Sequence, residues 1–127
     1  NLYGLESIED QIKAIDKISL QEQAKMLLSL VEEKNKMQEE LEQLINLYLS
    51  QDIDKLFSHT IENEDMPAKF EKYFITNRNK KMTREIIKIS RKKSCFHTVG
   101  AAHLGGANGI LQLLKNKGYK VEAVLLQ

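Results

Sequence analysis

The chain has 127 residues, 42% of them hydrophobic and 29% charged, with 19 basic and 18 acidic side chains and a net charge of +1. This composition is typical of a globular protein and excludes a disordered one. No apolar run approaches the roughly 18 to 20 residues of a membrane span. Residues 1–65 carry 15 acids and 6 bases, a net charge of −9, whereas residues 66–127 carry 3 acids and 13 bases, a net charge of +10. The single cysteine, Cys95, cannot form an internal disulfide.

The N-terminal part predicts a short strand followed by helices. Residues 1–5 are β-prone and resemble the end of a strand. Ser7 begins the sequence SIED and Ser19 begins SLQE, and both have the pattern of a helix-capping box. From Ser19, apolar residues continue at helical spacing to about Leu49, with a weak polar middle at residues 32–38.

The central part predicts further helices, because residues 5–99 contain no glycine. Asp52 is placed to cap a short helix. Residues 62–66 form an acidic loop, and Pro67 suits the first turn of the helix that follows. A further helix is predicted over residues 77–92.

The C-terminal part predicts a βαβ unit. Residues 95–99 form a β-prone run, residues 109–116 a helix that Gly118 ends, and residues 119–125 a second β-prone run. Such strand–helix–strand crossovers are almost always parallel and right-handed. The expected fold is therefore a helix-rich α/β domain. It has a small sheet of about three strands, with a long helical insertion between the first and second strands.

Two places carry residues suited to chemistry. Glu6 follows the first predicted strand, and His103 lies in the loop after the second, among Gly100, Gly105 and Gly106. Sites in open α/β sheets form beyond the carboxyl ends of strands. A carboxylate and an imidazole suit a divalent metal or an acid/base pair, and the glycines can free backbone N–H groups for an oxyanion. The structural alternatives are a helix-start acid for Glu6 and a backbone-bonded loop histidine for His103.

Four segments of the chain resemble one protein family. They are GLESIEDQ at residues 4–11, ISLQEQ at residues 18–23, NRNKKM at residues 77–82, and VGAAHLGGANGILQLLKNKGYKV at residues 99–121. Their order and spacing resemble those of the TraB/GumN family, which is related to Tiki-type metallopeptidases and to the erythromycin-esterase and ChaN-like proteins. The resemblance spans nearly all of residues 1–127 but only the C-terminal half of the family's domain. We therefore expect a single domain that is the C-terminal part of a larger one.

The resemblance implies roles for particular residues. Tiki-type relatives have two Gly-x-x-His motifs, an acid and an Arg/Asn pair. Gly100 to His103 matches the second Gly-x-x-His motif, Glu6 matches the acid, and Arg78 with Asn79 matches the pair. The first Gly-x-x-His motif belongs upstream and has no counterpart here, since neither of the other two histidines fits it.

The implied function is that of a metal-dependent hydrolase, most readily a peptidase. Glu6 and His103 would bind manganese, cobalt or zinc or move protons, and Arg78 and Asn79 would hold the substrate or an oxyanion. The structural alternative for Arg78 and Asn79 is that they cap or brace the helix that begins near Asn77 and pair with Glu6. With only one Gly-x-x-His motif, we expect this chain alone to bind the metal incompletely and to be inactive. The alternatives are a module that sequesters a peptide pheromone without cleaving it, and a scaffold that has lost the chemistry.

The expected partners follow from charge and from the predicted sheet. Residues 78–93 hold eight bases and one acid, without interleaved aromatic residues. We interpret them as a solvated face that complements the acidic half, and we expect no nucleic acid to bind. A peptide or protein substrate is expected, as is a homodimer through an open sheet edge or through helices. The resemblance suggests an extracytoplasmic bacterial protein, with a lipid anchor as one option, although the residues themselves establish no compartment.

Overall fold

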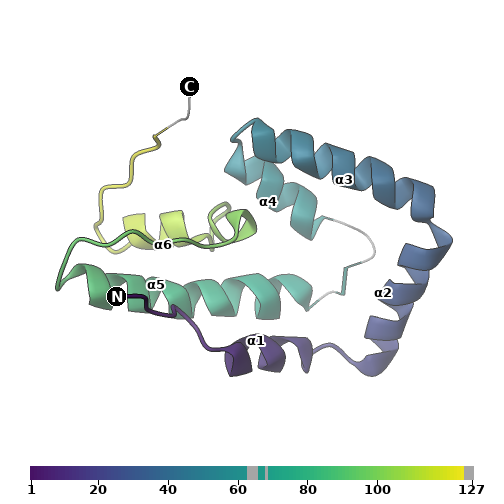
Figure 1. Cartoon of the computed structure of the whole chain (residues 1–127), viewed down its shortest axis with the longest axis horizontal. Helices are drawn as coiled ribbons and strands as arrows, with labels where there is room; N and C mark the ends of the chain where they lie inside the picture. Colours follow the sequence, from purple (N-terminus) through teal and green to yellow (C-terminus); the bar gives the residue numbers. More distant parts are fainter. Residues whose placement is uncertain (63–65, 68, 125–127) are drawn as a thin grey trace.

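A computed structural model describes residues 1–62, 66, 67 and 69–124, except for the side chains of residues 34–36. Within this part the regular structure is helical (Figure 1). The helices are α1 (Ile8–Ile15), α2 (Leu20–Glu32), α3 (Lys34–Leu49), α4 (Ile53–Ile61), the π-helical turn η1 (Glu71–Thr76), α5 (Asn77–Ser90), the 3-10 turn η2 (Ala101–His103) and α6 (Ile110–Lys115).

The predicted α/β fold is wrong, because the described residues contain no strand and no sheet. Residues 1–4, 95–99 and 119–124 lie outside the helices, as expected of strands, but no backbone hydrogen bond joins any two of these segments. A strand exists only when a neighbouring segment completes its ladder of hydrogen bonds. A β-prone sequence does not by itself provide that neighbour. The described residues therefore form neither the βαβ unit nor a helical insertion between strands. Residue 125 of the third predicted strand lies outside the described part.

The starts of α1, α2 and α4 were predicted correctly. In the capping box of α1, the Asp10 N–H donates to Ser7 Oγ at 3.2 Å and the Ser7 N–H donates to Asp10 Oδ2 at 3.0 Å. The same reciprocal pair joins Ser19 and Glu22 at the start of α2, at 3.2 and 2.9 Å. Asp52 caps α4 through a bond of 3.0 Å from the third helical N–H. These signals involve residues three positions apart, so the local sequence suffices to predict them.

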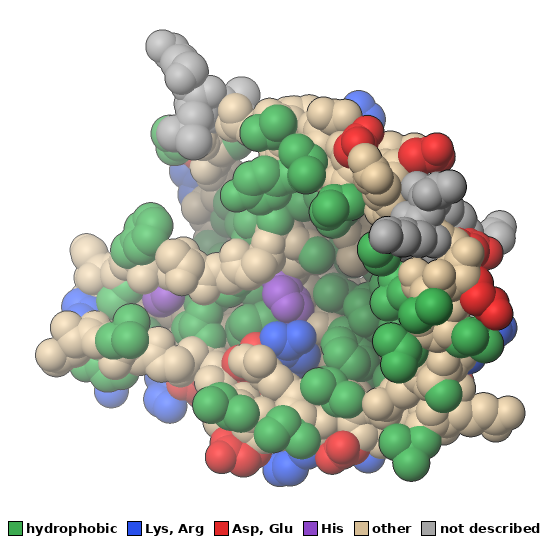
Figure 2. All heavy atoms as spheres, turned by 45° about the vertical axis from the view of Figure 1, so that its right-hand side comes forward, with side chains coloured by type: hydrophobic (Ala, Val, Ile, Leu, Met, Phe, Trp, Pro, Cys, Tyr) green, Lys and Arg blue, Asp and Glu red, His purple; other side chains and the backbone are tan. Residues whose placement is uncertain are grey.

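The long helix predicted from Ser19 to about Leu49 is divided in two. Glu33 has φ −108° and ψ 40°, which ends α2 and begins α3 within the polar stretch that the sequence marked as weak. No residue of α2 is buried. In Figure 2, which brings the α2 side of the molecule forward, hydrophobic side chains are spread over the visible face. Large apolar side chains stay exposed on both α2 and α3. They include Leu27, Leu28, Val31, Leu41, Ile45 and Tyr48.

A buried hydrophobic cluster lies between α5 and α6, which run side by side (Figure 1). Met82 and Ile86 of α5 bury their side chains against Ile110 of α6. Helices α1 to α4 pass around this pair as an open frame, and α4 returns to contact η2 (Figure 1). None of the described helices is both long and apolar enough to cross a membrane.

Candidate functional site

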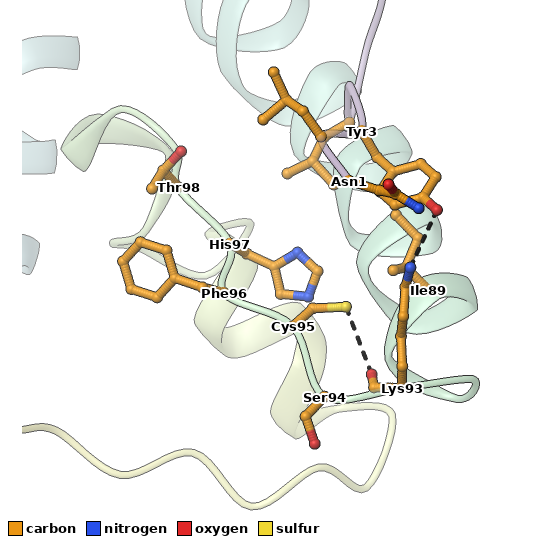
Figure 3. Close-up of a pocket in the computed structure, with 11 residues that line it drawn as sticks. Asn1, Tyr3, Ile89, Lys93, Ser94, Cys95, Phe96, His97 and Thr98 are labelled. Carbon is orange, nitrogen blue, oxygen red and sulfur yellow. Dashed lines mark hydrogen bonds between the residues drawn. The ribbon is translucent and has the colours of Figure 1, made fainter.

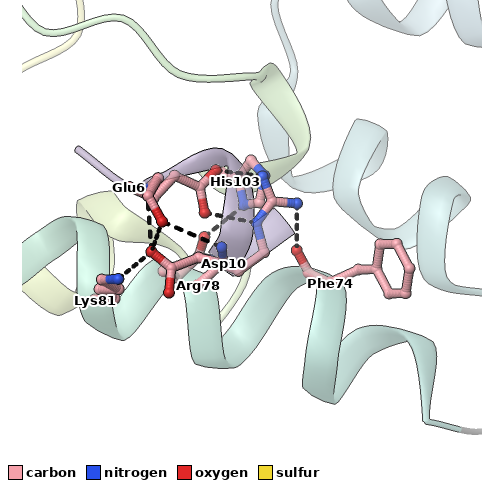
Figure 4. A network of polar contacts seen from close by, with 8 residues as sticks. Glu6, Asp10, Phe74, Arg78, Lys81 and His103 are labelled. Atoms are coloured by element: carbon pink, nitrogen blue, oxygen red, sulfur yellow. Dashed lines mark hydrogen bonds and ion pairs between the residues drawn. The ribbon is translucent and has the colours of Figure 1, made fainter. Parts of the chain in front are cut away.

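The structure brings together the four side chains that sequence analysis selected. Glu6 precedes α1, Arg78 and Asn79 lie in the first turn of α5, and His103 ends η2. Figure 4 shows Glu6, Arg78 and His103 beside one another where these elements meet. Because the described part has no sheet, helix α5 positions these groups, and not the ends of neighbouring strands.

A bidentate ion pair joins Glu6 and Arg78. Arg78 Nε donates to Glu6 Oε2 at 2.9 Å, and Nη2 donates to Oε1 at 2.5 Å. The side chains are only 10% exposed for Glu6 and 21% for Arg78. The hydrogen bonds from Arg78 lower the pKa of the Glu6 carboxyl, although burial opposes them. Glu6 is therefore an ionised clamp that fixes the plane of the guanidinium.

A second ion pair lies next to the first. Lys81 Nζ donates to Asp10 Oδ2 and so ties α5 to α1. The hydrogen bond from Lys81 holds the pKa of Asp10 well below its usual range, and the capping bonds from Ser7 add to the effect. Both pairs cross the same gap between helices and keep Glu6 in position.

Asn79 and His103 form the buried part of the site. The Asn79 side chain is fully buried, and its Oδ1 lies 2.6 Å from His103 Nδ1. Its Nδ2 donates to the carbonyl oxygen of Asn108 at 2.8 Å. Burial lowers the pKa of His103, the Arg78 charge lowers it further, and Glu6 partly opposes both. His103 is therefore neutral at neutral pH and carries an available lone pair.

A π-helical turn lies directly before Arg78 and Asn79. In η1 the Asn77 N–H donates to the carbonyl of Lys72, five residues earlier, so the turn is wider than an α-helical one. The neighbours Arg78 and Asn79 point about 100° apart on the helix. Arg78 thereby meets the segment before α1, and it also donates to the Phe74 carbonyl oxygen at 3.2 Å. Asn79 meets the loop before α6. Single π-helical turns are frequent at functional sites.

The glycines around His103 have different surroundings. A Cβ on Gly105 would lie 2.9 Å from the Ile53 carbonyl carbon, so this position brings the loop against α4. Gly106 has φ +77°, and its N–H donates to Asp54 Oδ1 at 2.9 Å. That N–H is thus occupied in this structure. A Cβ on Gly100 would make an ordinary contact of 3.6 Å with the His103 ring. The predicted oxyanion role of Gly100, Gly105 and Gly106 stays a prediction.

The described residues do not complete a metal site. Within the described ranges, no three His, Cys, Asp or Glu side chains lie close enough together to hold a metal ion. Of the two predicted metal ligands, Glu6 has both oxygens hydrogen-bonded to Arg78. His103 uses Nδ1 for Asn79, so its Nε2 is the ligand atom that has no partner among the described residues. Catalytic zinc sites use three protein ligands. A metal here would need ligands beyond the described residues.

A cleft of about 230 Å³ opens beside the ion pairs, between α1 and the junction of η1 with α5. It is lined by Glu6, Asp10, Lys13, Ala14, Lys17, Tyr73, Asn77, Arg78 and Lys81. The cleft gives solvent and small polar groups access to the Glu6–Arg78 pair.

The other two histidines lie away from this cluster. His97 and Cys95 line a separate pocket of about 400 Å³ between the N-terminal segment and residues 94–98 (Figure 3). His97 Nε2 lies 3.0 Å from Ser90 Oγ, and His59 Nε2 lies 3.4 Å from Gln43 Oε1. Neither histidine supplies a second imidazole to His103.

Sequence analysis missed Asn108 and Lys81 as parts of the site. Asn108 contributes only its backbone carbonyl, and a carbonyl leaves no signal in the residue type. Lys81 is one of several basic residues in its segment. The spacing of Lys81 three positions after Arg78 could have suggested a shared helix face.

The comparisons with known proteins identify a family. The model of the TraB/PrgY/gumN family matches residues 1–123, which confirms the resemblance found in the sequence motifs. No curated protein matches the chain, and no solved structure does.

Proposed function

Because the chain belongs to the TraB/PrgY/gumN family, we propose that it forms part of a hydrolase whose substrate is a peptide. The observation that supports this proposal is that a neutral His103, hydrogen-bonded to the Asn79 amide, lies beside the Glu6–Arg78 ion pair. The proposal includes a divalent metal, manganese, cobalt or zinc, only where ligands beyond the described residues complete its site. An extracytoplasmic, lipid-anchored location belongs to the same proposal and rests on the resemblance alone.

Each side chain has a role in this proposal. His103 Nε2 accepts the proton of the attacking water, whose oxygen bonds the peptide carbonyl carbon. The same proton then passes to the amine when the C–N bond breaks. Arg78 uses three of its five N–H groups for Glu6 and Phe74, so the remaining two can face the carbonyl oxygen as negative charge develops. Glu6 positions Arg78 and does not itself move a proton.

The second candidate is a module that binds a peptide without cleaving it. One support is the same ion pair, because both oxygens of Glu6 are hydrogen-bonded to Arg78. The other is that the described residues contain no cluster of three possible metal ligands. A cleft with fixed charges and no complete metal site suits recognition.

The two candidates differ in one experiment on the intact protein. Unstructured peptides are incubated with it after addition of manganese, cobalt or zinc, and both binding and new amino termini are measured. Under the hydrolase proposal, His103→Ala lowers the cleavage rate at least 100-fold, and Arg78→Lys lowers it by a similar factor because lysine lacks the planar fork.

His97→Ala is the matched control, because this histidine lies in a different pocket. It should cleave at the wild-type rate. Peptide that binds but stays intact with every metal favours the second candidate. Cleavage that His103→Ala leaves unchanged contradicts the proposed role of His103.

A further inference from the structure

The hydrogen-bond chain through Asn79 has a direction. It runs from the Asn108 carbonyl to the Asn79 amide and on to the His103 ring, with distances of 2.8 and 2.6 Å. A backbone carbonyl oxygen can only accept, so the NH₂ of Asn79 must face Asn108. The other end of the amide is then its carbonyl oxygen, which faces His103 and also can only accept.

The ring nitrogen nearest Asn79 must therefore carry a hydrogen. In the neutral imidazole one nitrogen is a donor and the other an acceptor, and the partner of one nitrogen decides the state of the other. Turning the Asn79 amide over would place two carbonyl oxygens against each other. Asn79 is fully buried, so water cannot replace the lost bonds.

We infer that Asn79 is a positioning residue that fixes His103 as the Nδ1–H tautomer and makes Nε2 the nitrogen offered to water, substrate or a metal. This inference rests on the proposed function only for the use that Nε2 is given. The Asn108 carbonyl, which no side chain reveals, is the group that sets the direction of the whole chain. Histidines that ligate metals commonly donate their second nitrogen to such a partner.

The test is a spectrum of the histidine rings that correlates their carbon-bound protons with both ring nitrogens, recorded on the ¹⁵N-labelled intact protein above neutral pH. His103 should give a protonated, pyrrole-type Nδ1 signal and an unprotonated, pyridine-type Nε2 signal. The His103→Gln spectrum identifies the signals. A wild-type spectrum with the proton on Nε2 overturns the inference.

Three variants separate positioning from general damage to the fold. Asn79→Asp keeps the oxygen that accepts from Nδ1–H but loses the NH₂ that bonds Asn108, so it should keep the pattern in a less stable fold. Asn79→Ala should lose the single tautomer. Thr83→Val changes another buried polar residue of α5 and should leave the ring signals unchanged. Retention of the Nδ1–H pattern in a folded Asn79→Ala variant contradicts the role of Asn79. If neither Asn79 variant folds, the wild-type spectrum still decides.

A separate readout links the tautomer to the proposed function. Titration with cobalt alone should show affinity roughly 10- to 100-fold weaker in Asn79→Ala and nearly unchanged in Asn79→Asp. The expected tautomer together with no metal binding and no cleavage would support the inference and contradict the proposed hydrolase. An Nε2–H tautomer in an active wild-type enzyme would contradict the inference and support the proposed hydrolase.

Discussion

At the residue scale, the Glu6–Arg78 pair makes stability depend on pH. Arg78 lowers the pKa of Glu6 from its usual 4.5 in the folded state. A carboxyl with a depressed folded pKa stabilises the fold fully above its unfolded pKa, and this stabilisation is lost as the pH falls through the folded value. Acid should therefore weaken the contact between α1 and α5.

We expect Glu6→Gln to lower the free energy of unfolding by about 2 kcal/mol at neutral pH, because it removes charge-assisted hydrogen bonds from a mostly buried pair. The difference from wild type should shrink as the pH falls below 4.5. Urea unfolding across the pH range measures it. The exposed Glu39→Gln should stay within about 0.5 kcal/mol throughout. A pH-independent difference for Glu6→Gln contradicts the ion-pair account.

Thr83 offers a stabilising change. Its side chain is 4% exposed, and its Oγ1 has no hydrogen-bond partner among the described residues. Thr83→Val replaces the hydroxyl with a methyl of similar size and should raise the free energy of unfolding by about 1 kcal/mol. Thermal and urea unfolding both measure this, with exposed Thr98→Val as the control. A destabilised Thr83→Val would indicate that the hydroxyl has a partner.

At the element scale, local sequence signals were sufficient to predict where α1, α2 and α4 begin, whereas the sequence did not show whether distant segments pair as strands. Ser7, Ser19 and Asp52 begin helices through bonds to residues three positions away, and the sequence predicted all three. The extended run 95–99 has the composition of a strand, but its ladder depends on a second segment that composition does not specify. The same limit applies to the site: motif resemblance selected Asn79, whereas its partner Asn108 could not be predicted.

The contact between α4 and the loop before α6 is tested by two glycines. Gly105→Ala would place its Cβ 3.0 Å from Phe57 Cβ and closer to the backbone of Ile53, so we expect it to cost about 1 to 3 kcal/mol. Gly100→Ala meets only the His103 ring, at 3.6 Å, and should be tolerated. Unfolding of both variants by urea gives the comparison. Equal stability would show that α4 can move away from the loop.

At the scale of the whole molecule, the two oppositely charged halves complement each other only in part. Arg78 and Lys81 pair with acids of the N-terminal part. The outer bases Lys80, Arg84 and Arg91 are exposed, and they form no ion pair with the described residues. Intramolecular pairing therefore explains the inner face of α5, and its outer face is a solvated basic surface.

Charge reversal distinguishes the two faces of α5. Lys81→Glu should lower the melting temperature, because it sets two carboxylates against each other next to Glu6. Arg84→Glu should change the free energy of unfolding by no more than about 0.5 kcal/mol. Added salt should reduce the difference between the variants. An Arg84→Glu variant as unstable as Lys81→Glu would point to a partner for the outer face.

The homodimer stays a prediction, now through helices, because the described residues form no sheet whose edge could pair. Exposed Leu28 and Val31 lie on one face of α2. Sedimentation velocity should show a dimer fraction that rises with concentration, and changing both residues to Lys should abolish it. Val124→Lys, at another exposed position, should leave the dimer intact. A monomer at every concentration contradicts the prediction.

The candidate site also has a consequence for the order of events as the chain folds. Arg78 lies 72 residues from Glu6, and His103 lies 24 residues from Asn79. Closing the longer loop costs only about 1 kcal/mol more than closing the shorter one, since this entropy grows with the logarithm of length. Long-range contacts of this kind nevertheless form slowly compared with the helices that carry them. A newly made chain can therefore form most of its helices before the site exists. Glu6 meets Arg78 only once α1 and α5 have come together.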